Sequence, residues 1–158
     1  MEPGRWNMSQ GLVIAGRSDV ATLSREDGMR IVVYYNQVVL DAGPRDSGVA
    51  HYFGSVGRIR PDWTVQVFAP NGERRSVVGE VKLTENTSYE RTGFSEAVLY
   101  RFEYAKDLTG WLKSVLVVPG TLPGAPRRGD ATIALGWPDW VPGVVLEGIL
   151  EGVGPGAR

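Results

Sequence analysis

The feature that most limits how this chain can fold is a β-hairpin pattern in the middle of the sequence. Residues 63–69 alternate their side chains with the two-residue period of a strand. Pro70-Asn71-Gly72 follows, and an Asn-Gly pair tolerates the positive φ angles of a tight turn. Residues 75–83 have the composition of the return strand. The sequence therefore predicts an antiparallel hairpin, which brings the outer ends of its two strands together.

Charged residues stand at these outer ends. Asp62 precedes the first strand, and Glu80-Val81-Lys82 closes the second. Facing positions have numbers that sum to roughly 142–144, which places Asp62 opposite residues 80–82. Glu80 and Lys82 are two positions apart and point to the same face. A two-residue loop would set Asp62 opposite Val81, on the other face, so a three-residue loop or a bulge is needed to gather all three side chains.

These residue types suit metal-dependent hydrolysis. Two carboxylates at one end of a sheet form a site for Mg²⁺ or Mn²⁺, which waters and a substrate phosphate complete. Such a metal stabilises charge at the phosphate and lowers the pKa of its bound water. A neighbouring lysine orients that water or stabilises the developing negative charge. Two exposed acids and a surface lysine would give the same short pattern, and the pattern alone favours that simpler interpretation.

A helix is predicted after the hairpin. Thr92 and Ser95 are candidate caps for a helix over Glu96–Asp107. The apolar residues of this segment recur at helical spacing and are expected to pack on the sheet: Phe94, Val98, Phe102 and Ala105.

The remaining segments complete a predicted α/β architecture. Four of them have strand or helix patterns: a strand region at 29–41 with a hairpin allowed around Asn36-Gln37, an apolar strand at 114–118, a strand at 131–135, and a helix from Pro142 to about Glu151. Residues 18–26 give a weak helix that Gly28 ends. We expect a single domain over residues 1–158, with a mixed central β-sheet flanked by helices and a C-terminal region at 130–151.

The motif and the order of elements resemble the core of the PD-(D/E)XK nuclease superfamily. Pro61-Asp62 opens a strand, Glu80-Val81-Lys82 closes the next, and a helix and an apolar strand follow. The resemblance covers about residues 55–120 and implies a restriction-endonuclease-like core with extra N-terminal strands. It also implies that Asp62 and Glu80 bind the divalent metal, that Lys82 serves the nucleophilic water, and that the main-chain carbonyl of Val81 is a further ligand.

The function implied by this resemblance is that of a hydrolase. We expect a Mg²⁺-dependent endonuclease, with Mn²⁺ as a substitute, whose substrate is DNA rather than RNA and whose product carries a 5′-phosphate. The oligomeric state stays open, and a homodimer and a larger protein assembly are both compatible with this function. The first core helix of the superfamily would fall in residues 18–27, with Glu26 as its acid.

Some branches of the superfamily carry Gln-x-x-x-Tyr on the helix after the hairpin. This chain has Tyr100 in place of the glutamine and Tyr104 in place of the tyrosine. Tyr104 and Arg101 would then face the site and contact the nucleic-acid backbone. A packed aromatic pair with a solvated arginine is an equally good interpretation.

Charge and composition restrict the partners. The net charge of −1 gives no general attraction to a polyanion, so any basic surface must be local. Arg127-Arg128, in a Gly/Pro loop, is the best candidate for a phosphate contact, although a solvated loop is the simpler alternative. The chain has no cysteine and one histidine, His51, which excludes cysteine-ligated zinc and multi-histidine sites. No apolar run reaches membrane-spanning length and no secretory signal is evident, so a cytoplasmic protein without membrane contact is expected.

Two other functions stay open. The same fold can serve as a catalytically inactive scaffold that binds nucleic acid or a protein partner, which the near-neutral charge favours. Finding Asp62 and Glu80 on opposite faces would support that hypothesis. An unrelated small β-rich domain with incidental acids is the third hypothesis, and absence of the helix over residues 95–107 would support it.

Overall fold

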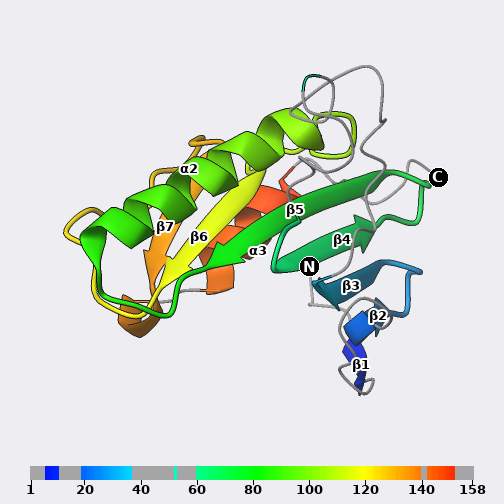
Figure 1. The fold of residues 1–158 in the computed structure, drawn as a ribbon. Coiled ribbons are helices and arrows are strands. Elements are labelled where there is room, and N and C mark those ends of the chain that lie inside the picture. Colours follow the sequence, from blue (N-terminus) through cyan, green and yellow to red (C-terminus); the bar gives the residue numbers. More distant parts are fainter. Residues whose placement is uncertain (1–5, 11–18, 37–51, 53–59, 140–141, 152–158) are drawn as a thin grey trace.

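The described strands form one sheet. The computed structural model describes residues 6–10, 19–36, 52, 60–139 and 142–151, and seven strands of this part of the chain lie in chain order across a single sheet (Figure 1). The strands are β1 (Trp6–Gln10), β2 (Asp19–Arg25), β3 (Arg30–Tyr35), β4 (Trp63–Phe68), β5 (Arg74–Val81), β6 (Ser114–Val118) and β7 (Thr132–Gly136). The helices are α2 (Thr87–Glu103) and α3 (Pro142–Leu150), with a 3-10 turn, η2, at Trp137–Asp139. The mixed α/β class that the sequence predicts is confirmed.

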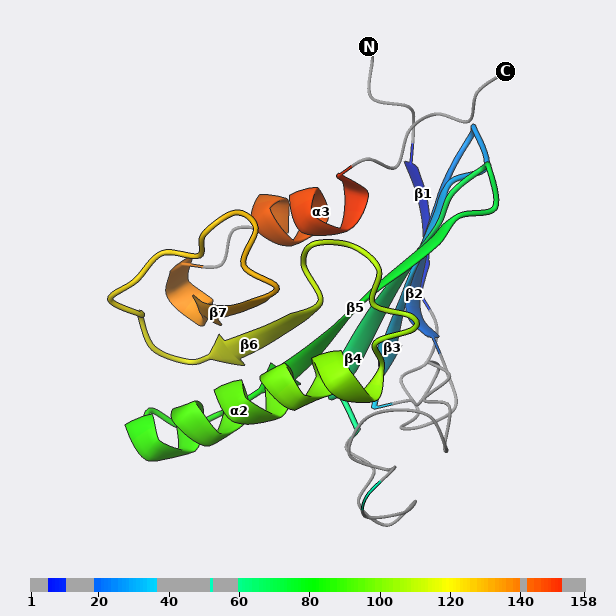
Figure 2. The ribbon, with the colours of Figure 1, turned by 90° about the horizontal axis from the view of Figure 1, so that it is seen from above.

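The sheet has an antiparallel part and a parallel part. Each strand from β1 to β5 runs antiparallel to the next, whereas β5, β6 and β7 run parallel. Parallel neighbours need a crossover connection, and α2 provides the one between β5 and β6. Helices α2 and α3 lie on opposite sides of the parallel part, and β1–β3 extend beyond both (Figure 2). None of the described helices is both long and apolar enough to cross a membrane.

The two faces of the sheet differ in chemistry because strand side chains alternate between them. Val67, Val77 and Val115 belong to one apolar core together with Val145 and Ile149 of α3. The other face, beneath α2, is mixed, because it buries Val78, Leu116 and Val118 beside a row of polar residues. The row consists of Thr64, Gln66, Ser76, Glu80, Ser114 and Thr132 of the strands and of Lys82, which directly follows β5. Within this row the Gln66 amide donates to the Ser76 hydroxyl over 3.2 Å, and the Ser114 and Thr132 hydroxyls are 2.9 Å apart. The candidate site therefore lies on the face that carries the buried polar row.

The turn between β4 and β5 sets the register of the hairpin. Paired residue numbers from Trp63↔Gly79 to Phe68↔Arg74 sum to 142. The Ala69 amide donates to the Glu73 carbonyl over 2.8 Å, which leaves a three-residue loop in which Gly72 has a φ of +84°. Glycine adopts this left-handed conformation without the steric penalty of a Cβ atom. The three-residue loop is the arrangement that places Asp62 across from Glu80.

Helix α2 begins earlier than the sequence pattern predicts. It spans Thr87–Glu103 rather than Glu96–Asp107, and its N-cap is Asn86, whose side chain accepts from the amides of Ser88 (3.0 Å) and Tyr89 (3.3 Å). The predicted caps lie inside the helix. There the Thr92 and Ser95 hydroxyls donate to main-chain carbonyls four residues earlier, each over 3.1 Å. Hydroxyl residues in that arrangement are tolerated within a helix.

The face of α2 that packs on the sheet also differs from the prediction. Phe94 and Phe102 are 38% and 58% exposed, and the buried positions include Gly93, Ala97 and Tyr100. The sheet surface beneath α2 is mixed, because buried Leu116 and Val118 of β6 lie there beside Glu80, and a Cβ at Gly93 would meet both Lys82 and Leu116. Small residues and a tyrosine hydroxyl suit that surface better than phenylalanine does.

The N-terminal helix is also a wrong prediction. Residues 19–25 form β2, which pairs with β1 on one side and β3 on the other. Glu26 is exposed in the turn to β3, where Gly28 has a φ of +90°, so it is not the acid of a first core helix. Strands β3, β6 and β7 and helix α3 confirm the other predicted elements, whereas residues 37–41 lie outside the described residues.

Candidate functional site

Asp62 is anchored at the outer end of the hairpin. Its main-chain amide donates to the Gly79 carbonyl over 2.9 Å, and its Oδ2 accepts from the Val81 amide over 2.7 Å. These bonds continue the β4–β5 ladder by one residue, with a side chain replacing a main-chain acceptor. Among the described residues no group donates to its other oxygen, Oδ1. Asp62 thus presents one carboxylate oxygen that has no protein partner there.

Glu80 and Lys82 form a buried ion pair on the α2 side of β5. Their exposed fractions are 6% and 9%, and Lys82 Nζ lies 2.5 Å from Glu80 Oε1. The Tyr100 hydroxyl of α2 donates to the other oxygen, Oε2. The same hydroxyl lies 3.0 Å from the carbonyl of Arg60, two residues before Asp62. Tyr100 therefore connects the strand that carries Glu80 with the segment that carries Asp62.

Lys82 has a second acidic partner. Its Nζ is 2.6 Å from Glu96 Oε2, on α2, and 5.1 Å from the centre of the Tyr89 ring. The lysine side chain runs close under the helix at Gly93, where an added Cβ would lie 2.7 Å from Lys82 Cγ. The ammonium is thus held between a strand carboxylate and a helix carboxylate.

Burial and neighbouring groups shift the protonation equilibria of the site. Burial raises the pKa of the Glu80 carboxyl, and this effect outweighs the hydrogen bonds from Lys82 and Tyr100, which lower it. Burial alone would lower the pKa of Lys82, but the hydrogen bonds to Glu80 and Glu96 prevail and raise it. Burial and the hydrogen bond to Glu80 raise the pKa of Tyr100. At neutral pH Lys82 is therefore an ammonium and Tyr100 a neutral phenol.

The donor set suits a hard divalent cation. The Gly79 carbonyl and the Val81 amide both point toward Asp62. Because the amide and the carbonyl of a strand residue point to the same side, the Val81 carbonyl also faces Asp62. Each carboxylate oxygen has two lone pairs, so the hydrogen bonds to Glu80 leave it acceptor capacity. The described residues contain no group of three or more His, Cys, Asp or Glu side chains that could hold a metal. Two carboxylates and a carbonyl fit Mg²⁺, which keeps several of its waters.

The other predicted contacts with nucleic acid lie elsewhere or are covered. Tyr104 is only 1% exposed, and its ring centre is 6.4 Å from that of Tyr100 at a tilt of 49°, as in a packed aromatic pair. Arg101 is half-buried. Arg127 is 83% exposed and pairs with Asp130 over 3.2 Å.

Arg128 lies toward the other end of β5. It pairs with the Glu151 carboxylate over 2.5 Å, and Arg75, near the start of β5, donates to the Glu151 carbonyl. Arg75 and Glu80 are five residues apart, which corresponds to about 16 Å along a strand. The structure therefore brings Asp62, Glu80, Val81 and Lys82 together but leaves Arg128 apart. His51 lies outside the described residues.

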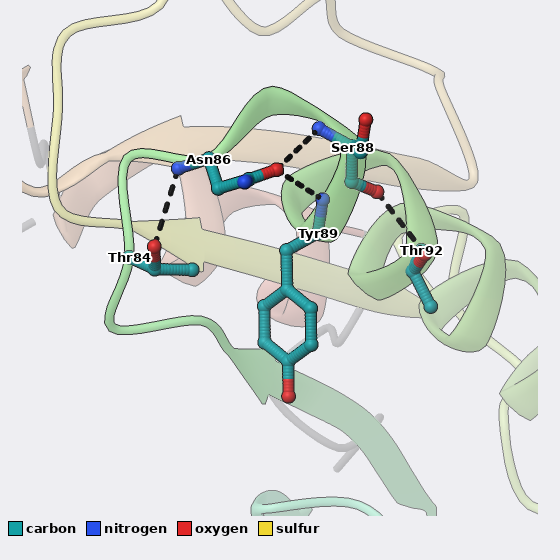
Figure 3. A pocket seen from close by; sticks show the side chains of 5 residues that line it. All are labelled: Thr84, Asn86, Ser88, Tyr89 and Thr92. Carbon is teal, nitrogen blue, oxygen red and sulfur yellow. Dashed lines mark hydrogen bonds between the residues drawn. The ribbon is translucent and has the colours of Figure 1, made fainter.

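An open pocket of about 490 Å³ adjoins the first turn of α2 (Figure 3). Its lining is mostly hydroxyl and amide side chains: Thr84, Asn86, Ser88, Tyr89 and Thr92. Tyr89 connects this pocket with the site, because its ring also contacts the Lys82 ammonium.

The sequence predicts that Arg101 and Tyr104 of this helix face the site, whereas in the structure Tyr89, Glu96 and Tyr100 contact it. Tyr89, Gly93, Glu96 and Tyr100 follow one another at spacings of four, three and four residues, which places them on one face of the helix. That row becomes visible in the sequence only once the helix is started at Thr87 rather than at Glu96.

Comparisons of this chain with protein-family models, with curated proteins and with solved structures give no match. The function is therefore inferred from the geometry of the site itself.

Proposed function

We propose that this chain is a Mg²⁺-dependent nuclease with a restriction-endonuclease-like core, and that it hydrolyses phosphodiester bonds in DNA. The observation that carries the proposal is the junction of Asp62 with Glu80-Val81-Lys82 at the end of a three-residue hairpin. The element order β4, β5, α2, β6 supports it as well, because it matches the order of the PD-(D/E)XK core.

The residues of the chain divide the work as follows. Asp62, the Glu80 carboxylate and the Val81 carbonyl would hold Mg²⁺ or Mn²⁺. When bound, the cation would supply Lewis-acid stabilisation of the phosphate charge and activation of water. The Lys82 ammonium orients the attacking water and stabilises negative charge as it develops, rather than accepting a proton. Tyr100 fixes the Glu80 carboxylate. In-line attack of water on the phosphorus breaks the P–O3′ bond and leaves a 5′-phosphate and a 3′-hydroxyl.

The test is a cleavage assay on the full chain. Supercoiled plasmid, linear duplex, single-stranded DNA and RNA are each incubated with Mg²⁺, Mn²⁺ or EDTA. We expect cleavage of DNA with either metal and none with EDTA. Lys82→Ala should abolish it, whereas Lys106→Ala, at an exposed lysine outside the site, should retain it. Equal cleavage by both variants would contradict the assignment of Lys82.

A second candidate function is an inactive scaffold of the same fold that binds nucleic acid or a protein partner. One observation favours it: Glu80 and Glu96 already neutralise the Lys82 ammonium within the protein. Calorimetric titration with Mn²⁺ separates the two candidates if no substrate is cleaved. Mn²⁺ binding that Asp62→Asn removes would indicate a nuclease that lacks its substrate or its partner in a homodimer or larger assembly. Absence of binding would favour the scaffold.

A further inference from the structure

The Lys82 ammonium forms ion pairs with carboxylates from two elements of the fold, β5 and α2. Its Nζ lies 2.5 Å from Glu80 Oε1, on the same strand, and 2.6 Å from Glu96 Oε2, on α2. The side chains of Lys82 and Glu80 are 11% and 8% exposed, whereas that of Glu96 is 37% exposed. Glu96 thus closes the outer side of a largely buried ion pair.

Helix α2 has a glycine, Gly93, at the point where the Lys82 side chain runs beneath it. A Cβ atom on Gly93 would stand 2.7 Å from Lys82 Cγ, 2.8 Å from Lys82 Cε and 3.0 Å from Leu116 Cδ1. Non-bonded carbon atoms prefer separations of about 3.5–4.0 Å, so a side chain larger than hydrogen would displace the lysine or the helix. One turn further along the same face, Glu96 meets the ammonium.

Two anchors restrict a lysine far more than one does. The four-carbon stem is flexible, and a single partner lets the ammonium rotate about it. Carboxylates on two rigid elements fix the ammonium in one place, and a reacting group must be held to within roughly 0.5 Å to act efficiently. Without Glu96, the ammonium would keep Glu80 and the Tyr89 ring, whose centre is 5.1 Å from Nζ, and would lose its second carboxylate.

We propose that Glu96 is a positioning residue of the site, a third acid supplied by α2, which fixes the Lys82 ammonium beside Glu80. We call the arrangement of Lys82 between Glu80 and Glu96 the clamp, and it is inferred from the two ion pairs and the space at Gly93. Its effect on catalysis rests on the proposed nuclease function, and the two parts are tested separately.

The clamp is tested by a ¹H–¹⁵N spectrum of the lysine ammonium groups in the full chain. The sequence has three lysines, Lys82, Lys106 and Lys113, and Lys82→Arg assigns the first of them. An ammonium that is buried and doubly paired exchanges its protons slowly and gives a resolved signal. We expect this signal in the wild-type protein and its loss or displacement in Glu96→Gln. The exposed Glu85→Gln is the matched control and should leave it unchanged. The backbone amide spectrum shows that each variant is folded.

Catalysis is tested with the same variants. In Glu96→Gln we expect kcat for DNA cleavage to fall by about ten- to a hundredfold with KM changed by less than about twofold, because the lysine charge is misplaced while substrate binding is kept. A wild-type protein without cleavage would overturn the nuclease function but not the clamp. A wild type without a resolved Lys82 signal, or an unchanged signal in Glu96→Gln, would overturn the clamp. Unchanged kcat in Glu96→Gln of an active protein would overturn the positioning role.

Discussion

At the scale of single residues, each side-chain hydrogen-bond donor of the site serves more than one acceptor. The Tyr100 hydroxyl has one proton, yet it lies within reach of both Glu80 Oε2 and the Arg60 carbonyl. Lys82 serves two carboxylates. Because Glu80 and Tyr100 are 6% and 3% exposed, water cannot readily replace a lost partner.

Removal of the Tyr100 hydroxyl should therefore be costly. Tyr100→Phe leaves the buried Glu80 carboxylate with one donor fewer, which costs about 1–3 kcal/mol of stability. Urea unfolding measures this change in the free energy of unfolding. Tyr89→Phe, at a ring that is 54% exposed, is the matched control and should change stability by less than about 0.5 kcal/mol. Equal effects of the two substitutions would contradict the role of the Tyr100 hydroxyl.

The raised pKa of Glu80 predicts a pH dependence of stability. The folded protein holds the Glu80 proton more tightly than the unfolded chain does, mainly because the carboxyl is buried. Its contribution to stability is therefore fully present below the unfolded pKa of about 4.3 and is lost as the pH rises through the raised folded value. Denaturant unfolding at a series of pH values from about 4 upward should show this loss in the wild type. Glu80→Gln, which has no titrating group there, should not show it, and parallel pH curves for the two proteins would refute the assignment.

At the scale of elements, the sequence predicts strands better than the helix that completes the site. The β4–β5 hairpin has an alternating pattern and an Asn-Gly turn, both of which are local signals, and its three-residue loop brought Asp62 to Glu80 as required. Helix α2 offered a misleading apolar stripe, Phe94 and Phe102, which is exposed. The face of α2 that packs on the sheet is determined by the strands beneath it, and no local sequence pattern encodes that tertiary context.

The N-terminal strands show the same limit. Residues 19–25 carry no strong period, and the sequence predicts only a weak helix over residues 18–26. Their strand conformation comes from pairing with β1 and β3, and the hydrogen bonds of that pairing are nonlocal. Of the candidate site, Asp62, Glu80 and Lys82 could be predicted from the hairpin, whereas Glu96 required the correct phase of α2.

Two opposing effects on stability are expected when Gly93 of α2 is replaced by alanine. In an exposed helix, replacing glycine by alanine stabilises by roughly 1 kcal/mol. Here the added Cβ would lie 2.7 Å from Lys82 Cγ, and overpacking of this kind costs typically about 1–3 kcal/mol. We expect the clash to prevail, so that Gly93→Ala is less stable than the wild type in thermal unfolding. Ser95→Ala, at an exposed position of the same helix, is the control and should be neutral or slightly stabilising. A Gly93→Ala protein more stable than the wild type would show that Lys82 does not need this space.

At the scale of the whole molecule, the sheet separates packing from chemistry. The face toward α3 carries the apolar core, whereas the face toward α2 carries a buried polar row, which ends in Glu80 and Lys82, beside the apolar Val78, Leu116 and Val118. The hairpin contributes Asp62, Glu80 and Lys82, and α2 contributes Glu96 and Tyr100. With a net charge of −1, the chain has no excess of basic residues to hold a long polyanion, so we expect catalysis on nucleic acid to depend on the site itself and on a partner chain for affinity.

The most direct test of this account is nicking of supercoiled plasmid DNA in Mg²⁺ by the full chain, beside Asp62→Asn and the distant control Asp27→Asn. In the proposed nuclease Asp62 is a metal ligand, whereas Asp27 pairs with Arg25 in the turn between β2 and β3. We predict that the wild type and Asp27→Asn convert supercoiled plasmid to open-circular and linear forms with 5′-phosphate ends, and that Asp62→Asn does not. Cleavage that persists in Asp62→Asn, or that EDTA fails to stop, would contradict the central claim.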